Sequence, residues 1–326
     1  MKVVGEIDNM FALVRAAIDG RQAEGMEMDA AGWWRLFRLA QQNHVVALSA
    51  GALPDGVPRD VLMPWLAERE KVAARYRFQC DVQRQLTDTM SAHGIETLVL
   101  KGTHLAQYYP VAETREFGDL DLYFYDRHDE ADEVARHELK VVVDNHSHHH
   151  TRYELRGITI ESHFDFVNTH YPPGNRRYEA MLKEMAPSPT FEVLFLLRHM
   201  ACHFASSRIT LRDFCDWMLT CRALRDGADW NLVQQTVDEY GMRPFVDALE
   251  AVEKDNMADE RFVRDIVYGG LRDHESENVG RIMWKMRRWR ANAWKRRMVY
   301  ADSQAALLLS SISAHGLKPQ SIMHKM

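Results

Sequence analysis

The spacing of apolar positions changes twice along the chain and divides it into three regions. Residues 1–92 place apolar side chains at helical spacing, through IDNMFALVRAAI and then AGWWRLFRLAQQNHVVALSAGAL, with a break at PDGVP. A further helix is expected from about Pro58 to Ala92. The pattern predicts a helical N-terminal region over residues 1–92.

Shorter apolar runs follow in residues 93–172. ETLVLKG, LYFYDR and KVVVDN each have the character of a strand, and THLAQYYP suits one short helix ended by Pro110. In HHHTRYELRGITIESHFDF the side chains alternate on both sides of Arg156-Gly157, which predicts a β-hairpin with its turn there. These residues are expected to form a small α/β unit.

Helical spacing returns after the YPPG break and continues to the C-terminus. The expected organisation is an N-terminal helical region (residues 1–92), an α/β core (residues 93–172) and a C-terminal helical domain (residues 173–326). Helices segregated from a small sheet in this way define an α+β fold.

Composition narrows the class of protein. Of 326 residues, 46% are hydrophobic and 27% are charged, as is usual for a globular chain. A formal net charge of −6 argues against general coating of nucleic acid. The cysteines show no CxxC spacing, and no apolar run approaches the roughly 20 residues that span a bilayer. We expect a cytoplasmic protein with reduced thiols and no membrane partner.

Two acidic residues stand at the head of a predicted strand. Asp119 and Asp121 flank a single leucine. Residues i and i+2 of a strand project to one face, so both carboxylates point the same way while Leu120 and Leu122 enter the core. Like charges held together are costly, and a divalent cation is the usual relief. Taken alone, a solvated Asp-Leu-Asp turn explains the pattern equally well.

The hairpin offers a third carboxylate. Glu161 shares one face of its predicted strand with Thr159, His163 and Asp165, and the isoleucines occupy the other face. Three carboxylates on one sheet face can hold two Mg²⁺ ions. The alternative for Glu161 is a surface residue paired with a lysine or arginine.

Lys101, Gly102 and Thr103 follow the first predicted strand directly. Gly102 permits close approach of a ligand to the backbone, and the N-terminus of the next helix can receive a phosphate. Lys101 would place a point charge on a triphosphate. The spacing does not fit a Walker A loop, which disfavours a P-loop enzyme.

Arg115 is a second candidate for phosphate binding, and its alternative is a local salt bridge with Glu113 or Glu116. Further along the chain, LRDFCDW contains charged residues that we expect to form a buried ion-pair node tying that helix to the core: Arg212, Asp213 and Asp216.

Histidines gather in two places. In the run NHSHHH at most His148 and His150 could converge with His163, and we expect one or two of these histidines to line the active face; structural zinc is a less favoured alternative. His199 and His203 are four residues apart on a predicted helix. They are either helix-packing residues or, for His203, a side chain that faces a nucleotide.

The segment between Arg281 and Arg297 contains eight basic residues and no acidic one. Trp284, Trp289 and Trp294 are interleaved among them. An amphipathic helix with a solvated basic face is the simpler interpretation. The functional interpretation is an electrostatic surface for RNA or for a triphosphate, with aromatic rings for stacking.

The ordered motifs LVLKGTHLAQYYP, REFGDLDLYF, ITIESHF, LLRHMACHF and LRDFCDW, from about Val99 to Trp217, resemble the uncharacterised nucleotidyltransferases of the DNA polymerase β-like superfamily. The resemblance implies a small mixed β-sheet core with helices on one side and transfer of an NMP from an NTP. The chain departs from the wider superfamily at Lys101-Gly102, where Gly-Ser is usual; KGG-type nucleotidyltransferases of toxin–antitoxin systems depart similarly.

The resulting hypothesis is a metal-dependent nucleotidyltransferase that releases pyrophosphate and modifies a hydroxyl of a small molecule, an RNA or a protein. Two Mg²⁺ ions, or Mn²⁺ in their place, are its expected cofactors. The expected catalytic and metal-binding residues are Asp119, Asp121 and Glu161. The expected nucleotide-binding residues are Lys101, Gly102, Thr103, Arg115, His163 and His203. The alternatives are an inactive nucleotide-binding or partner-docking module with the same fold, and a zinc-dependent hydrolase.

Overall fold

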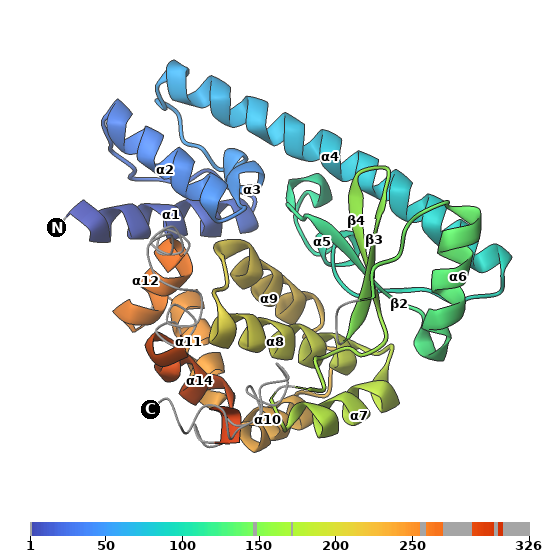
Figure 1. Ribbon diagram of the computed structural model, residues 1–326. Coiled ribbons are helices and arrows are strands. Elements are labelled where there is room, and N and C mark those ends of the chain that lie inside the picture. The colour runs from blue at the N-terminus through green and yellow to red at the C-terminus, as the bar shows by residue number, and fades with distance from the viewer. Residues whose placement is uncertain are drawn as a thin grey trace, which may run out of the picture.

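The computed structural model of the protein describes residues 2–145, 149–170, 172–254, 259–269, 289–302 and 306–308. Figure 1 shows a small β-sheet flanked by helices from both ends of the chain. The predicted α+β class is confirmed.

The predicted N-terminal helices are present. They are α1 (Lys2–Ile18), α2 (Ala30–Gln42), α3 (Val46–Ala50) and α4 (Arg59–Ala92). Helix α2 begins where Asp29 accepts a hydrogen bond from the Gly32 amide, which satisfies one of the free donors of the first turn. The long helix α4 extends from this bundle to the sheet, where its Val82, Leu86 and Met90 are fully buried.

The sheet is mixed, in the order β1-β2-β4-β3. Its strands are β1 (Leu98–Val99), β2 (Asp119–Tyr123), β3 (His150–Leu155) and β4 (Ile158–His163). Strands β2 and β4 are parallel, whereas β1 pairs with β2 and β3 pairs with β4 in antiparallel fashion. The predicted hairpin turn is confirmed at Arg156 and Gly157, both with positive φ, as a tight two-residue turn requires.

The two faces of the sheet have different partners. One face packs Leu120, Leu122, Ile158 and Ile160 against α4 and α6 (His128–Glu138). The other face carries the polar side chains of β2 and β4 and is directed toward α8 (Pro189–Ser206), on the opposite side of the sheet from α4 and α6 in Figure 1. The alternation of side chains along the strands therefore puts apolar residues on one sheet face and the polar candidate site residues on the other, as the sequence predicts.

Helices continue through the C-terminal region. Besides α8, they are α7 (Asn175–Met185), α9 (Leu211–Ala223), α10 (Trp230–Glu239), α11 (Arg243–Glu253), α12 (Glu260–Tyr268) and α14 (Ala293–Val299), whereas the short helix α5 (Thr103–Ala106) lies between β1 and β2. Phe204, Phe245 and Phe262 form a fully buried aromatic contact between three of these helices. One hydrophobic core cluster contains side chains from both the N-terminal and the C-terminal helices. The domain boundaries expected near residues 92 and 172 stay a prediction.

Two predicted strands differ from the structure. KVVVDN is not a strand: Val142 is 89% exposed, and Asp144 makes only an isolated bridge to Arg152. Val141 and Val143 pack against the core, but the backbone of the run pairs with the sheet only at Asp144, so no ladder forms. LYFYDR leaves the sheet after Tyr123, since Tyr125 takes a positive φ and opens a short 3₁₀ turn. Helix α6, which follows, was not predicted.

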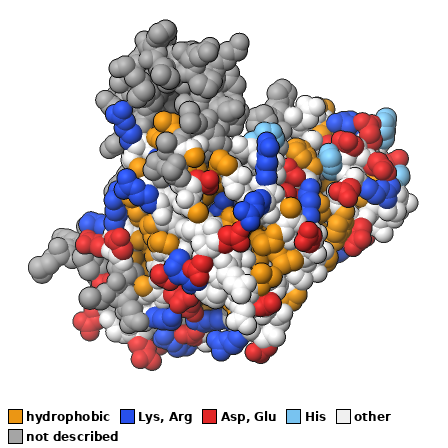
Figure 2. Space-filling model, turned by 90° about the horizontal axis from the view of Figure 1, so that it is seen from below, with side chains coloured by type: hydrophobic (Ala, Val, Ile, Leu, Met, Phe, Trp, Pro, Cys, Tyr) orange, Lys and Arg blue, Asp and Glu red, His pale blue; other side chains and the backbone are white. Residues whose placement is uncertain are grey.

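The surface carries charges of both signs. On the face drawn in Figure 2, Lys and Arg side chains lie among Asp and Glu side chains wherever the structure describes the chain. None of the helices within the described ranges has both the length and the apolar character needed to cross a bilayer.

Candidate active site

The parallel register of β2 and β4 brings two of the three predicted carboxylates, Asp121 and Glu161, together. Asp121 lies directly beside Glu161, and Asp119 lies beside Thr159, on the face directed away from α4. Oxygen atoms of Asp121 and Glu161 and a ring nitrogen of His163 all lie within 4.8 Å of one another. Glu161 therefore does reach Asp121 from the neighbouring strand, and Asp119 shares their face two residues earlier.

Asp121 is the most enclosed of the three acids, at 1% exposure. Its Oδ1 accepts contacts from Lys101 Nζ at 2.9 Å and from His163 Nε2 at 3.2 Å. Burial opposes ionisation, but the charge of Lys101 and the hydrogen bond from His163 outweigh it and hold the pKa of Asp121 well below its usual value. The carboxylate is therefore ionised and is held between two cationic groups.

His163 bridges two of the acids. Its Nε2 lies 3.2 Å from Asp121 Oδ1 and 3.7 Å from Glu161 Oε2, and the residue is 4% exposed. Burial favours the neutral ring, yet hydrogen bonds to both carboxylates raise the pKa of His163 to about 9. The same contact lowers the pKa of Glu161 against the effect of burial. His163 thus neutralises the carboxylates that it contacts.

Asp119 has the opposite electrostatic character. Burial, and then the negative charge of Asp121, raise the pKa of the Asp119 carboxyl group. The nearby Lys101 ammonium offsets these effects only in part. A further cation close to Asp119 would favour its ionised form, which is the electrostatic situation of a metal ligand.

Lys101 connects the sheet to α8. Its Nζ lies 3.0 Å from His199 Nε2 as well as 2.9 Å from Asp121. Burial and the Lys101 charge lower the pKa of His199 well below its usual value, so the neutral ring accepts a hydrogen bond from the ammonium group. The His203 ring lies 4.4 Å from that of His199 and is exposed. His199 was not among the predicted site residues. Its spacing of four residues from His203, which places both rings on one helix face, is the sequence feature that could have indicated it.

Gly102 takes a backbone conformation that a side chain would strain, with φ +61° and ψ −119°. Its carbonyl accepts a hydrogen bond from Arg115 Nη1 at 3.0 Å, and the hydroxyl of the next residue, Thr103, donates to Gln83. The helix that begins there, α5, has four residues, so its dipole adds little to anion binding.

Arg115 forms a buried ion pair with Asp216. It is 3% exposed, and its Nε and Nη2 each donate to the Asp216 carboxylate at 2.8 Å. Tyr109 donates to the same carboxylate at 2.7 Å. The partner is neither of the neighbouring glutamates, so the alternative of a local salt bridge is wrong, and phosphate binding by Arg115 stays a prediction. The expected node on α9 exists in part, because Asp216 pairs with Arg115 and Arg212 pairs with Asp213.

The basic C-terminal segment is only partly described, since residues 281–288 lie outside the described ranges. Within the rest, Lys295 is 2% exposed and contacts Asp265 at 2.5 Å, and Arg296 is 3% exposed with its guanidinium 3.5 Å from the centre of the Trp289 ring. These two cations therefore stabilise the fold and do not face a ligand, whereas Arg290 and Arg297 are exposed.

The histidine run also falls partly outside the described ranges, and His148 with it. His149 and His150 are described, and both converge with His163. The expected convergence of His150 with His163 is therefore present, and His149, which the strand alternation left out, joins it.

Comparison with known proteins agrees with the geometry of the carboxylates. A family model described as "Uncharacterised nucleotidyltransferase" matches residues 29–252, which is more than half of the chain and includes the whole candidate site. No curated protein and no solved structure was found to match. The chain belongs to the uncharacterised nucleotidyltransferase family.

Proposed function

We propose that the protein transfers an NMP from an NTP to the hydroxyl group of an acceptor with the help of divalent metal ions. The observation that carries the proposal is the convergence of Asp121 and Glu161 on adjacent strands, next to Asp119 and to the Lys101 ammonium group. In the reaction, the acceptor oxygen forms a bond to the α-phosphorus, the bond to the β-phosphate oxygen breaks, and pyrophosphate leaves; the hydroxyl proton passes to solvent.

The carboxylates fit divalent ions by their chemistry. Carboxylate oxygens are the ligands that Mg²⁺ and Mn²⁺ prefer, and the low pKa of Asp121 keeps one of them ionised at neutral pH. Asp119, Asp121 and Glu161 are the residues that would hold the ions. When bound, such ions neutralise the triphosphate and lower the pKa of the acceptor hydroxyl.

In this proposal Lys101 binds the phosphates and His199 holds the Lys101 ammonium group in position. The ammonium group is held at the carboxylates by Asp121 and His199, so it is already oriented toward the place where a triphosphate would lie. Gly102 leaves the adjoining backbone open to close approach because it has no side chain. His163 keeps Asp121 and Glu161 turned toward each other, and the exposed His203 is the contact we assign to the nucleotide from α8.

The direct test is release of pyrophosphate. The purified chain is incubated with each labelled NTP, a divalent ion and fractionated cell extract, and labelled products are identified by mass spectrometry. The proposal predicts NTP-dependent pyrophosphate release that Asp119→Asn abolishes without a change in the circular dichroism spectrum. Calorimetric binding of Mg²⁺–ATP without pyrophosphate release in any fraction would favour an inactive nucleotide-binding module.

A further inference from the structure

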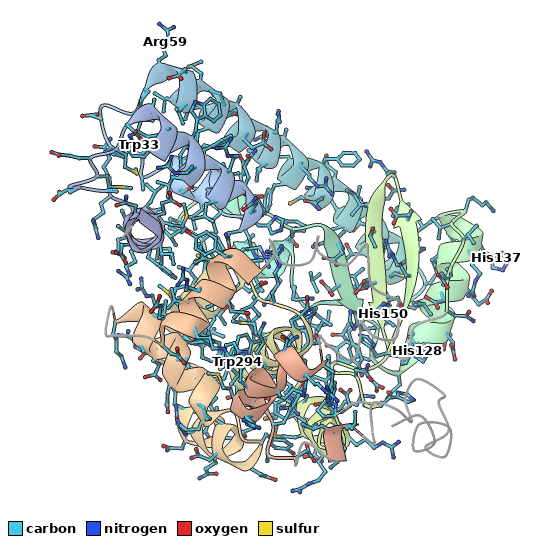
Figure 3. All side chains as sticks on the ribbon, turned by 60° about the vertical axis from the view of Figure 1, so that its left-hand side comes forward. Trp33, Arg59, His128, His137, His150 and Trp294 are labelled. Carbon is cyan, nitrogen blue, oxygen red and sulfur yellow. The ribbon has the colours of Figure 1, made fainter. Side chains whose placement is uncertain are left out.

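Three histidines converge beside the carboxylates at the open end of the hairpin. The ring centres of His149 and His150 lie 4.4 Å apart. The centre of the His163 ring lies 5.6 Å from that of His149 and 5.2 Å from that of His150. One ring nitrogen from each residue lies within 4.8 Å of the other two. Figure 3 shows His150 at the end of the hairpin strands, and its pairing with His163 places it on the sheet face opposite the core cluster that includes α6.

The backbone fixes this convergence. His150 and His163 are direct partners in the antiparallel pairing of β3 and β4, so their side chains emerge side by side on one face. The carbonyl of His149 accepts hydrogen bonds from the amides of Phe164 at 3.1 Å and Asp165 at 3.4 Å. The chain on both sides of the cluster is therefore tied to the strand that carries His163, and the three rings are positioned in advance.

The arrangement disfavours a proton on His149 and on His150, whose pKa values are lowered first by burial. Burial, and then the neighbouring histidines, lower the pKa of His149 to about 3. Among the described residues, Glu161 is the carboxylate with ion-pair contacts to two of the rings. Its oxygens lie 3.7 Å from the Nε2 atoms of His150 and His163. Imidazole nitrogens that face a common point, with a carboxylate beside them, are a nitrogen-rich donor set for a transition metal. His163 is protonated by its contacts with the carboxylates, so it would release a proton when it binds a metal.

We propose that His149, His150 and His163 bind Zn²⁺, with Glu161 as the fourth ligand. Three imidazole nitrogens and one carboxylate oxygen make a tetrahedral zinc set, whereas Mg²⁺ prefers oxygen alone. Zinc–nitrogen bonds of about 2.0–2.1 Å place the nitrogens about 3.4 Å from one another. To bind one zinc ion, the three nitrogens, which lie within 4.8 Å of one another, would approach to that separation by rotation of their side chains.

Zinc at this position would compete with the carboxylate site, and this consequence rests on the proposed function. Glu161 and His163 belong to both groups, so a zinc ion that takes them withdraws one acid from the nucleotide-binding ions and removes a partner of Asp121. Zinc is therefore expected to inhibit NMP transfer. His149 contributes only to the zinc group, so His149→Ala is expected to keep transfer activity and to lose this inhibition.

The test is a titration of the metal-free full chain with Co²⁺, which reports tetrahedral coordination through its visible absorption, followed by displacement with Zn²⁺. The wild type is expected to bind one equivalent tightly. His149→Ala and His150→Ala should each weaken binding by about 100-fold or more. His137→Ala is the matched control, because His137 lies on the outer side of α6, as Figure 3 shows, and it should bind as the wild type does. His150→Cys restores a zinc ligand and should restore binding with a thiolate band in the spectrum.

Three results would overturn the zinc site: no binding by the wild type, binding by His149→Ala and His150→Ala as tight as that of the wild type, or loss of zinc in Asp119→Asn while His149→Ala retains it. The last would place the ion at the carboxylates. None of these measurements depends on catalysis, so the zinc site and the proposed transferase activity can fail independently.

Discussion

The ammonium group of Lys101 lies 2.9 Å from Asp121 Oδ1 and 3.0 Å from His199 Nε2, so one lysine joins the first strand loop, the acidic strand and α8. The ion pair with Lys101 compensates the negative charge of the buried Asp121 carboxylate. In the proposed function, it also holds a cation near the place where a triphosphate would lie. We therefore regard Lys101 as the residue that exchanges a protein carboxylate for a phosphate when nucleotide binds.

Replacement of Lys101 by methionine is expected to weaken Mg²⁺–ATP binding by about 10- to 100-fold, since hydrogen bonds to charged groups contribute about 1.5–3 kcal/mol. Isothermal titration calorimetry with a non-hydrolysable ATP analogue measures this. Lys71→Met is the control, because the Lys71 side chain is 72% exposed on α4 and contacts only Glu68 among the described residues. Unchanged affinity in Lys101→Met would remove the lysine from the nucleotide site.

His163 should make stability depend on pH. Its pKa rises from an ordinary 6.5 to about 9 in the folded protein, so its contribution is fully present below pH 6.5 and is lost as the pH rises through about 9. The shift corresponds to about 3 kcal/mol. Urea denaturation in EDTA between pH 6 and pH 10 should show this loss in the wild type and a flatter profile in His163→Gln. Parallel profiles for the two proteins would contradict the assignment.

Arg115 and Asp216 should matter for folding. Arg115→Met leaves a buried carboxylate without its bidentate partner, and we expect a loss of about 3–5 kcal/mol in the free energy of unfolding. A second change, Asp216→Leu, removes the orphaned charge and should recover part of that loss, at the cost of the Tyr109 hydrogen bond. Denaturation of both single variants and the double variant gives the coupling energy; additive losses would mean that the pair is not coupled.

Gly102→Ala should destabilise the protein by about 1–3 kcal/mol, because alanine is strained at φ +61° and ψ −119°. The added methyl group would also meet Leu120 and Phe117 at 3.4–3.5 Å. Gly5→Ala in α1 is the matched control: nothing lies within 4 Å of its new Cβ, and alanine is favoured inside a helix. Thermal unfolding of both variants tests the difference, and equal effects would contradict a special backbone at Gly102.

The spacing of apolar residues predicted those elements in which short-range sequence alternation decides which side chains are buried. The hairpin followed from alternation around Arg156-Gly157, and the shared face of Asp121 and Glu161 followed from strand geometry. The strand predicted at KVVVDN is wrong because local β-propensity does not decide whether a neighbouring strand is there to pair with: only Asp144 of this run pairs with the sheet, and Val142 is exposed.

Long-range pairing accounts for most of what sequence could not predict at the site. Arg115 and Asp216 are 101 positions apart, and Lys101 and His199 are 98 apart, so neither contact leaves a local spacing signal. The role of His163 against the carboxylates also depends on the strand register, because it requires β4 to lie parallel to β2.

The central claim is that Asp121 and Glu161 hold divalent ions for a nucleotide. It is tested most directly by calorimetric titration of a non-hydrolysable ATP analogue into the wild type, Asp121→Asn and Glu161→Gln, each with and without Mg²⁺. We predict Mg²⁺-dependent binding by the wild type and loss of that dependence in both variants, with folding preserved. Equal Mg²⁺-dependent affinity in all three proteins would contradict the account.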